Sequence, residues 1–360
     1  DQLIGGLSGQ TRFLDDRLLS TLGYYFSQNE RESENLVDAA STDFSSDSFK
    51  SENYKIETSH ELSVGEEHKI RLDLQWREEA GKGESSFNGT DSAIGEKHQG
   101  VLGEALTYIY ESEAWFGDVG VRSDQSTEIN DIFSHRTSFG RFLSSGKRSK
   151  IYITYGTGFK LPSLYQLYSS FGNTSLDHEY SRTGEVTWQG NLTQKDLSSI
   201  TVFDNIYRDL IDYDTSTNKY LNVAKANSRG VELQTRVQLQ TDLSIKAFFN
   251  YLDSEDETTG LPLVRRPRQS FSLEADYQVT AFTSYLKYGY RAKRPDIDPV
   301  TFGRITNSSY GVLDLGTEYK INDEFSIKAR LENVFDKKYE EVAGYGTPGL
   351  SFYAGLTGRL

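Results

Sequence analysis

The stretch His68-Lys-Ile-Arg-Leu-Asp-Leu-Gln-Trp76 decides the fold class of this chain. Its apolar residues Ile70, Leu72 and Leu74 fall on every second position, and charged residues occupy the positions between them. A period of two places alternate side chains on opposite faces of an extended strand. The stretch therefore predicts a β-strand with one apolar face and one charged face.

The same alternation recurs along the chain, for example over 231–239, 243–251 and 271–279, and no helix-period stripe of useful length is found. The pattern predicts about 17 strand segments. These are 4–12, 17–28, 49–63, 67–78, 99–111, 114–124, 131–144, 148–157, 180–191, 195–207, 220–239, 242–253, 268–278, 281–292, 308–320, 324–334 and 350–360. The fold class is therefore all-β.

The connections between these segments distinguish two all-β architectures. In a soluble sandwich the polar face meets water, whereas in a membrane barrel it lines a wet lumen and the apolar face meets lipid. Short connections at 65–66, 112–113, 145–146, 193–194, 241–242, 279–280 and 322–323 alternate with long ones near 29–46, 79–97, 158–178, 208–219, 254–266, 293–307 and 336–347. This sorting predicts an antiparallel transmembrane barrel with tight periplasmic turns and long extracellular loops.

Composition excludes several functions. The formal net charge of −14 argues against nucleic-acid binding, which needs a clustered basic surface. The absence of cysteine excludes disulfides, thiolate metal sites and thiol catalysis. No apolar run is long enough for a membrane-spanning helix. Because the chain begins at Asp1 and contains no Met, we interpret it as a processed or truncated product.

Four ordered segments carry a family resemblance. They are Tyr155-Gly-Thr-Gly-Phe-Lys-Leu-Pro-Ser-Leu-Tyr-Gln-Leu-Tyr168 with the following 172–176, Asn227-Ser-Arg-Gly-Val-Glu232, Leu331-Glu-Asn-Val-Phe-Asp-Lys-Lys-Tyr339, and the terminal alternating strand. Together they resemble the TonB-dependent outer-membrane receptors over roughly 200 residues. Within that family, segments 206–214, 263–266 and 339–345 are similar to the cobalamin receptor group.

The resemblance implies an organisation and a function. It implies a bacterial outer-membrane barrel of about 22 strands closed by an N-terminal plug. No plug-like segment is visible, so we expect residues 1–360 to form a single barrel domain whose plug and first strands lie upstream. It further implies import of a scarce nutrient, cobalamin or a related corrinoid first and a ferric siderophore next. The implied partners are the TonB complex, acting through the plug, and outer-membrane lipid or lipopolysaccharide.

Ligand choice in such a receptor is expected to lie in the external loops. Loop 158–178 concentrates apolar and aromatic residues, which either pack against neighbouring loops or form a binding surface. A basic group at 265–268 and 291–294 would either bind an anionic ligand or lipopolysaccharide phosphate, or pair with the adjacent acidic loop. The candidate ligand-binding residues are Tyr165, Tyr168, Phe171, Asn173, Tyr213, Arg266, Arg294 and Tyr345.

Catalysis and metal binding find little support in the residues. The five histidines show no metal-ligand spacing, and no serine lies in a nucleophile elbow, so we expect no enzyme activity. No cofactor is required, and calcium is a candidate at Asp212 and Asp214, although a solvated acidic loop explains these residues as well.

Two other functions compete with the receptor hypothesis. A complete, plugless barrel would be a passive porin-type channel, which conducts ions steadily without a partner. A β-sandwich adhesin would be soluble without detergent.

Overall fold

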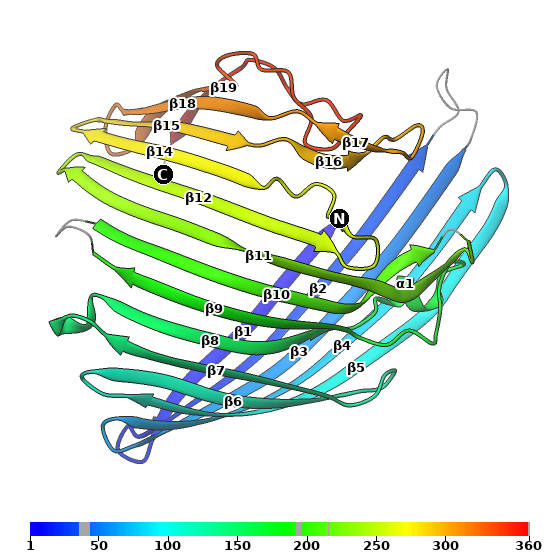
Figure 1. The fold of residues 1–360 in the computed structure, drawn as a ribbon, viewed down its shortest axis with the longest axis horizontal. Coiled ribbons are helices and arrows are strands. Elements are labelled where there is room, and N and C mark those ends of the chain that lie inside the picture. Colours follow the sequence, from blue (N-terminus) through cyan, green and yellow to red (C-terminus); the bar gives the residue numbers. More distant parts are fainter. Residues whose placement is uncertain (36–43, 192–195, 215, 359–360) are drawn as a thin grey trace. The chain divides into compact units, whose positions relative to one another are not determined.

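A computed structural model describes residues 1–35, 44–191, 196–214 and 216–358. Of the residues described, eighteen strands form one sheet and two short strands form another. The neighbouring strands pair in antiparallel fashion, as between β4 and β5 (Figure 1). Within the same residues, no helix is long and apolar enough to cross a membrane. The predicted all-β class is confirmed.

The element bounds agree with the alternation. The strands are β1 Gln2–Phe13, β2 Leu18–Asn35, β3 Ser45–Val64, β4 His68–Phe87, β5 Thr90–Glu111, β6 Trp115–Ser126, β7 Ile132–Phe142, β8 Lys150–Lys160, β9 Glu179–Gly190, β10 Asp196–Asp214, β11 Lys219–Gln240, β12 Leu243–Asp256, β13 Leu261–Pro262, β14 Gln269–Val279, β15 Phe282–Arg291, β16 Arg294–Ile297, β17 Arg304–Asn307, β18 Tyr310–Lys320, β19 Phe325–Glu332 and β20 Ser351–Gly358, with one 3₁₀ turn at Ser145–Lys147 and one helix, α1, at Leu164–Tyr168. Each predicted segment coincides with one strand. The short strands β13, β16 and β17 lie inside connections that were predicted to be long.

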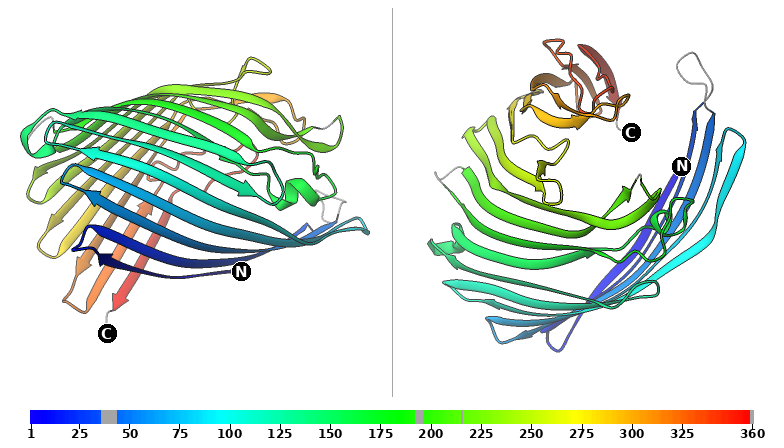
Figure 2. Two further views of the ribbon diagram at one scale, coloured as in Figure 1. Left: turned by 90° about the horizontal axis from the view of Figure 1, so that it is seen from below. Right: turned by 45° about the vertical axis from the view of Figure 1, so that its right-hand side comes forward.

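The chain divides into two compact units. The first contains residues 1–140, 154–183 and 207–225, and the second contains 141–153, 184–206 and 226–360. In the first unit each of the strands β1 to β6 pairs with the next, and Figure 2 shows β1 to β5 side by side. In the second unit the ladder runs through β11, β12, β14, β15, β18, β19 and β20. The single domain predicted for 1–360 stays a prediction.

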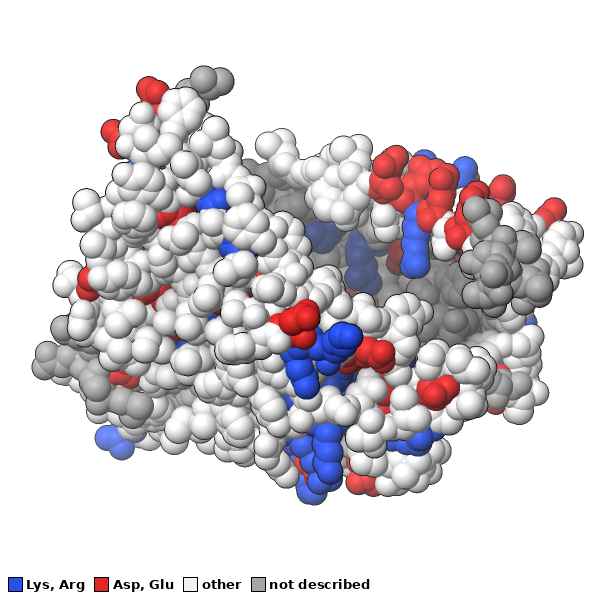
Figure 3. Space-filling view, turned by 90° about the horizontal axis from the view of Figure 1, so that it is seen from above, with Lys and Arg blue, Asp and Glu red and all other residues white. Residues whose placement is uncertain are grey.

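The two faces of the strands differ as the alternation requires. In β4 the apolar residues Ile70, Leu72, Leu74 and Trp76 are all exposed, so none of the described residues covers them fully. Figure 3 likewise shows broad areas that carry no Lys, Arg, Asp or Glu. An apolar sheet face without a protein partner is what a lipid-facing surface requires.

Several predicted long loops are continuations of strands. Residues 79–97 form a β-ribbon rather than a loop, because β4 and β5 remain paired up to Phe87 and Thr90. The turn is Asn88-Gly89, with φ of 48° and 81°. These positive values suit a two-residue hairpin turn, in which asparagine and glycine tolerate a left-handed backbone. The connection at 208–219 is likewise mostly strand, because β10 extends to Asp214 and β11 begins at Lys219.

The alternation of short and long connections is not strict. The connection between β6 and β7 covers only 127–131. It lies at the other end of β6 from the turn at 112–114, where a long connection was expected. The predicted turn at 193–194, the tip of the predicted loop 29–46 and Leu360 lie outside the described residues.

Candidate functional site

The connection that follows β8 contains the helix α1. Pro162 and Ser163 precede it, and the Ser163 hydroxyl accepts a hydrogen bond from the Gln166 amide at 3.2 Å. In return, the Gln166 side-chain oxygen accepts from the Ser163 amide at 2.9 Å. This capping box satisfies two amides at the start of the helix. The local sequence therefore fixes where the connection turns.

Leucines of this connection pack inward. Leu164 is 1% exposed, and Leu167 and Leu176 are also buried. A Cβ at Gly81 of β4 would lie 3.0 Å from Leu164 Cδ1, so the absence of a side chain there lets α1 approach the strand. The two roles considered for this loop are thus divided: the leucines pack, and aromatic rings remain outside.

Four aromatic rings form what we call the aromatic cluster: Tyr165, Phe171, Tyr213 and Tyr220. Their ring centroids are 6.3 Å apart for Tyr165 and Tyr220, 5.6 Å for Tyr213 and Tyr220, and 5.7 Å for Phe171 and Tyr213. The interplanar angles of 65–88° are edge-to-face geometry, a favoured arrangement of aromatic pairs. Tyr165, Phe171 and Tyr213 are 42%, 37% and 36% exposed, so the cluster presents an aromatic surface to its surroundings.

Hydrogen bonds to backbone carbonyls hold together the two segments that carry the aromatic cluster, 165–173 and 213–220. The Tyr220 amide donates to the Phe171 carbonyl at 3.0 Å, and the Asn173 side-chain amide donates to the Tyr220 carbonyl at 3.0 Å. Lys219 Nζ donates to the Gly172 carbonyl at 3.0 Å. Asn173, predicted to contact ligand, therefore has a visible positioning role. Burial, followed by the neighbouring Tyr165 and Tyr213, raises the pKa of Tyr220, which keeps its phenol neutral.

A cavity of about 450 Å³ lies beside the cluster, within the first unit. Tyr165, Ser169 and Phe171 form one side of it, and Phe49 and Ile94 of strands β3 and β5 lie on the other. The volume is within the range of small-molecule sites, and the lining mixes apolar side chains with serine hydroxyls and the charged residues Arg31, Asp47 and Glu84. The exposed rings and the apolar part of the lining suit a ring-bearing ligand.

Tyr168 makes a separate set of contacts. Its hydroxyl donates to a Glu128 carboxylate oxygen, and Lys97 Nζ lies 4.7 Å above its ring centroid. The hydrogen bond to Glu128, with burial, raises the pKa of Tyr168 to about 12. Tyr168 therefore remains a neutral donor that connects α1 to two other segments of the first unit.

The candidate calcium ligands have other partners. Asp214 accepts hydrogen bonds from the Ser216 amide at 3.0 Å and the Thr217 hydroxyl at 2.8 Å. These bonds, the Ser216 amide first, lower the pKa of Asp214. Asp212 accepts from the Tyr213 amide at 2.8 Å. Among the residues described, no group of three or more His, Cys, Asp or Glu is placed to hold a metal, and calcium at this turn stays a prediction.

The other three candidate residues belong to the second unit. Arg294 is 4% exposed, and its guanidinium donates to the carbonyls of Glu340 and Glu341 at 2.6 and 2.9 Å. Arg266 is exposed, and Tyr345 is largely exposed. Arg294 thus supports the loop at 336–347, whereas the other two are free to meet a ligand.

Sequence reasoning missed Asp296, which organises the loops of the second unit. Its side chain is fully buried. It accepts from Arg265 Nε and the Ile297 amide at one oxygen, and from Asn307 Nδ2 and the Ala343 amide at the other, each at 2.8 Å. Burial alone would raise its pKa, but the Ala343 amide and the Arg265 guanidinium outweigh burial and lower the pKa.

We call Arg265, Asp296, Asn307 and Ala343 the Asp296 cluster. It joins the connections at 257–268, 292–309 and 333–350. Of the predicted basic group, Arg265 therefore pairs inside this cluster, and Arg268 pairs with Asp253 at 3.2 Å.

Known proteins share this architecture. The family described as TonB dependent receptor-like, beta-barrel matches residues 3–334. The chain is similar to the pyoverdine outer membrane receptor FpvA from Pseudomonas aeruginosa, with 15% identity, a TM-score of 0.79 and coverage of 100% of this chain and 61% of that chain. A mutant of the ferric enterobactin receptor PfeA from Pseudomonas aeruginosa, in complex with enterobactin, gives 19% identity, a TM-score of 0.77 and coverage of 99% and 62%. The copper transporter OprC gives 12% identity, a TM-score of 0.81 and coverage of 99% and 67%.

At these identities the structural similarity shows the fold, and the family match shows the membership. The chain spans about three fifths of the length of the two siderophore receptors. It matches a family of receptors rather than enzymes, whose barrels cross the bacterial outer membrane many times. The chain therefore belongs to the TonB-dependent receptor β-barrel family and is a multi-pass β protein of the outer membrane.

Proposed function

We propose that the intact protein is a TonB-dependent outer-membrane transporter that captures a scarce nutrient at its external loops and imports it into the periplasm. The observation that carries the capture step is the aromatic cluster. Three of its four rings remain exposed, and Tyr165 and Phe171 line a cavity, while neighbouring leucines are buried. The family match supports the transport step. TonB would act through a plug domain, and no chemical step on the ligand is needed.

The ligand is proposed to be a metal-containing nutrient, either cobalamin or a related corrinoid or a ferric siderophore. The likeness of segments 206–214, 263–266 and 339–345 to the cobalamin receptor group supports a corrinoid. The names of the structural neighbours support a siderophore. Both ligand types are large and partly apolar, so an exposed aromatic surface would contribute through buried area and ring contacts.

Replacing Tyr213 by Ala is expected to weaken ligand capture by about tenfold, because removal of a central aromatic contact costs more than 1 kcal/mol at typical binding hot spots. Phe171→Ala should have a similar effect, since the two rings contact each other. The measurement is equilibrium binding of labelled cobalamin and of labelled ferric enterobactin to cells that display the full-length protein.

Tyr345→Ala provides the comparison, because this residue is also an exposed loop tyrosine but belongs to the second unit. A smaller loss than for Tyr213→Ala would assign capture to the aromatic cluster. Unchanged binding of both ligands to the Tyr213→Ala and Phe171→Ala variants would exclude the cluster from the binding surface.

A further inference from the structure

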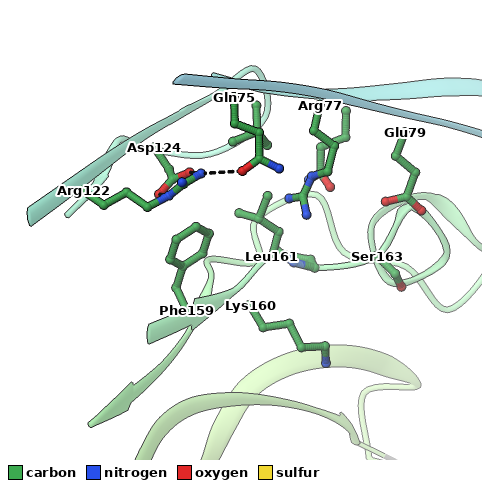
Figure 4. Close-up of a pocket in the computed structure, with 12 residues that line it drawn as sticks. Gln75, Arg77, Glu79, Arg122, Asp124, Phe159, Lys160, Leu161 and Ser163 are labelled. Carbon is green, nitrogen blue, oxygen red and sulfur yellow. Dashed lines mark hydrogen bonds and ion pairs between the residues drawn. The ribbon is translucent and has the colours of Figure 1, made fainter. Parts of the chain in front are cut away.

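A second cavity, of about 320 Å³, lies on the polar face of strands β4, β5 and β6 (Figure 4). The strand register arranges its floor in rows. Gln75 lies opposite Gly103, which lies opposite Asp124, and Glu79 lies opposite Gln99. Arg77 faces Val101 in the row between them. We call this space the polar-face cavity; residues 159–163 cover it.

The first row is closed to a ligand. Arg122 donates two hydrogen bonds of 2.7 Å to the two oxygens of Asp124, and one of 3.0 Å to the Gln75 side-chain oxygen. A Cβ at Gly103 would lie 2.0 Å from Arg122 Nη2, so the glycine is what lets the guanidinium lie across the sheet. The Arg122 and Asp124 charges therefore neutralise each other.

The other rows retain unused donors. Gln99 is 4% exposed, and its Nε2 has no hydrogen-bond partner. The Arg77 side chain is exposed and its charge interacts with that of Glu79, and Figure 4 shows its guanidinium pointing into the cavity. Because a buried amide without a partner is costly, its N–H groups are suited to an incoming acceptor.

The lining also contains the carboxylate of Glu79, whose negative charge would repel a bound anion. Glu79 lies cross-strand from Gln99, and burial raises its pKa against the opposing effect of the Arg77 charge. Lys160, at the covering segment, pairs with Glu179 at 3.2 Å. Leu161 and the fully buried Pro162 add an apolar roof, which strengthens polar contacts beneath it.

We infer that the polar-face cavity binds an oxyanion group, a carboxylate or a phosphate, of a small ligand. The Arg77 guanidinium supplies paired N–H donors that match two oxygens, and Gln99 Nε2 supplies a third donor. This site goes beyond the proposed capture of nutrient at the aromatic cluster, and neither depends on the other.

The experiment is isothermal titration of the detergent-purified full-length protein with succinate and, separately, with inorganic phosphate. Arg77→Gln and Gln99→Glu should each weaken binding by about tenfold, because each removes a charge-assisted hydrogen bond. Glu79→Gln should tighten binding, since it removes the opposing charge. Arg71→Gln is the matched control: it removes an arginine from the same face of β4, where Arg71 already pairs with Asp73 at 3.1 Å.

Arg77→Lys keeps the charge but loses the paired donors, and should bind at an intermediate strength. Preference for succinate or for phosphate would identify the source of the oxyanion. Absence of binding by both anions, or an equal loss in Arg71→Gln and Arg77→Gln, would overturn the inference. Neither result would bear on nutrient uptake, which the aromatic-cluster variants test.

Discussion

Replacing Leu356 by Arg is expected to lower the free energy of unfolding in a lipid bilayer by about 2–4 kcal/mol, or to block assembly. Leu356 is 70% exposed on β20 and pairs with Ile327 of β19, another exposed apolar residue. Since the described residues leave both side chains exposed on this apolar face, an arginine there would have to enter hydrocarbon. Leu273→Arg, on β14, should behave in the same direction.

The control is Gly355→Arg, which places the same charge on the adjacent residue and the opposite face. A Cβ at Gly355 meets no atom within 4 Å, so a side chain has room. Its stability should stay within about 0.5 kcal/mol of the unmodified protein. Urea unfolding in phospholipid vesicles measures all three variants. Equal stability of Leu356→Arg and Gly355→Arg would contradict the assignment of the lipid-facing surface.

Replacing Asp296 by Ala is expected to loosen three connections of the second unit together. The substitution leaves the buried donors of Asn307 and Ala343, and the Arg265 guanidinium, without their acceptor. Loss of this buried carboxylate should cost about 3 kcal/mol locally. Hydrogen exchange at the Ala343 amide should accelerate by about a hundredfold.

Asp298→Ala is the matched control within the same hairpin. The Asp298 side chain accepts from the amides of Val300 and Thr301, at 2.9 and 2.8 Å, inside its own turn. Faster exchange should therefore be confined to residues 300–301. If Asp296→Ala left the Ala343 amide protected, the Asp296 cluster would not be what joins the loops.

The same cluster should respond to pH in one direction. The folded-state pKa of Asp296 is lowered, so its stabilisation is complete above the ordinary aspartate pKa of about 3.9 and is lost as pH falls through the lower folded value. Protection of the Ala343 amide, corrected for intrinsic exchange, should be constant from about pH 7 to 4 and fall only at more acidic pH. Loss of protection near neutral pH would contradict this sign.

The strands could be predicted because their two faces meet different surroundings. Segment 68–76 must present apolar residues outward and polar residues inward, and apolar and polar residues therefore alternate along its sequence. The ribbon at 79–97 could not be recognised in this way, since both of its faces contain polar residues. Asn88-Gly89 was the available signal, because this pair favours a two-residue hairpin.

The candidate site could be predicted only in part, because contacts between distant segments of the chain leave no pattern in the local sequence. The composition of loop 158–178 identified a packed or ligand-binding segment, but only the fold separates the buried Leu164 from the exposed Tyr165. Arg294 had the features of a ligand-binding residue, yet its partners are carbonyls 46 and 47 residues away. Asp296 carries no local motif, and its role arises from contacts between distant segments. Gln99 likewise carries no local motif, and only the fold places it in the lining of a cavity.

Energy-dependent uptake distinguishes active import by this protein from passive conduction. Cells that express the full-length protein would be given labelled cobalamin or labelled ferric enterobactin, with and without TonB. We expect at least one ligand to accumulate only when TonB is present, and Tyr213→Ala to reduce this accumulation. Equal uptake without TonB, together with steady ion conductance of the purified protein in planar bilayers, would contradict active transport and identify a passive channel.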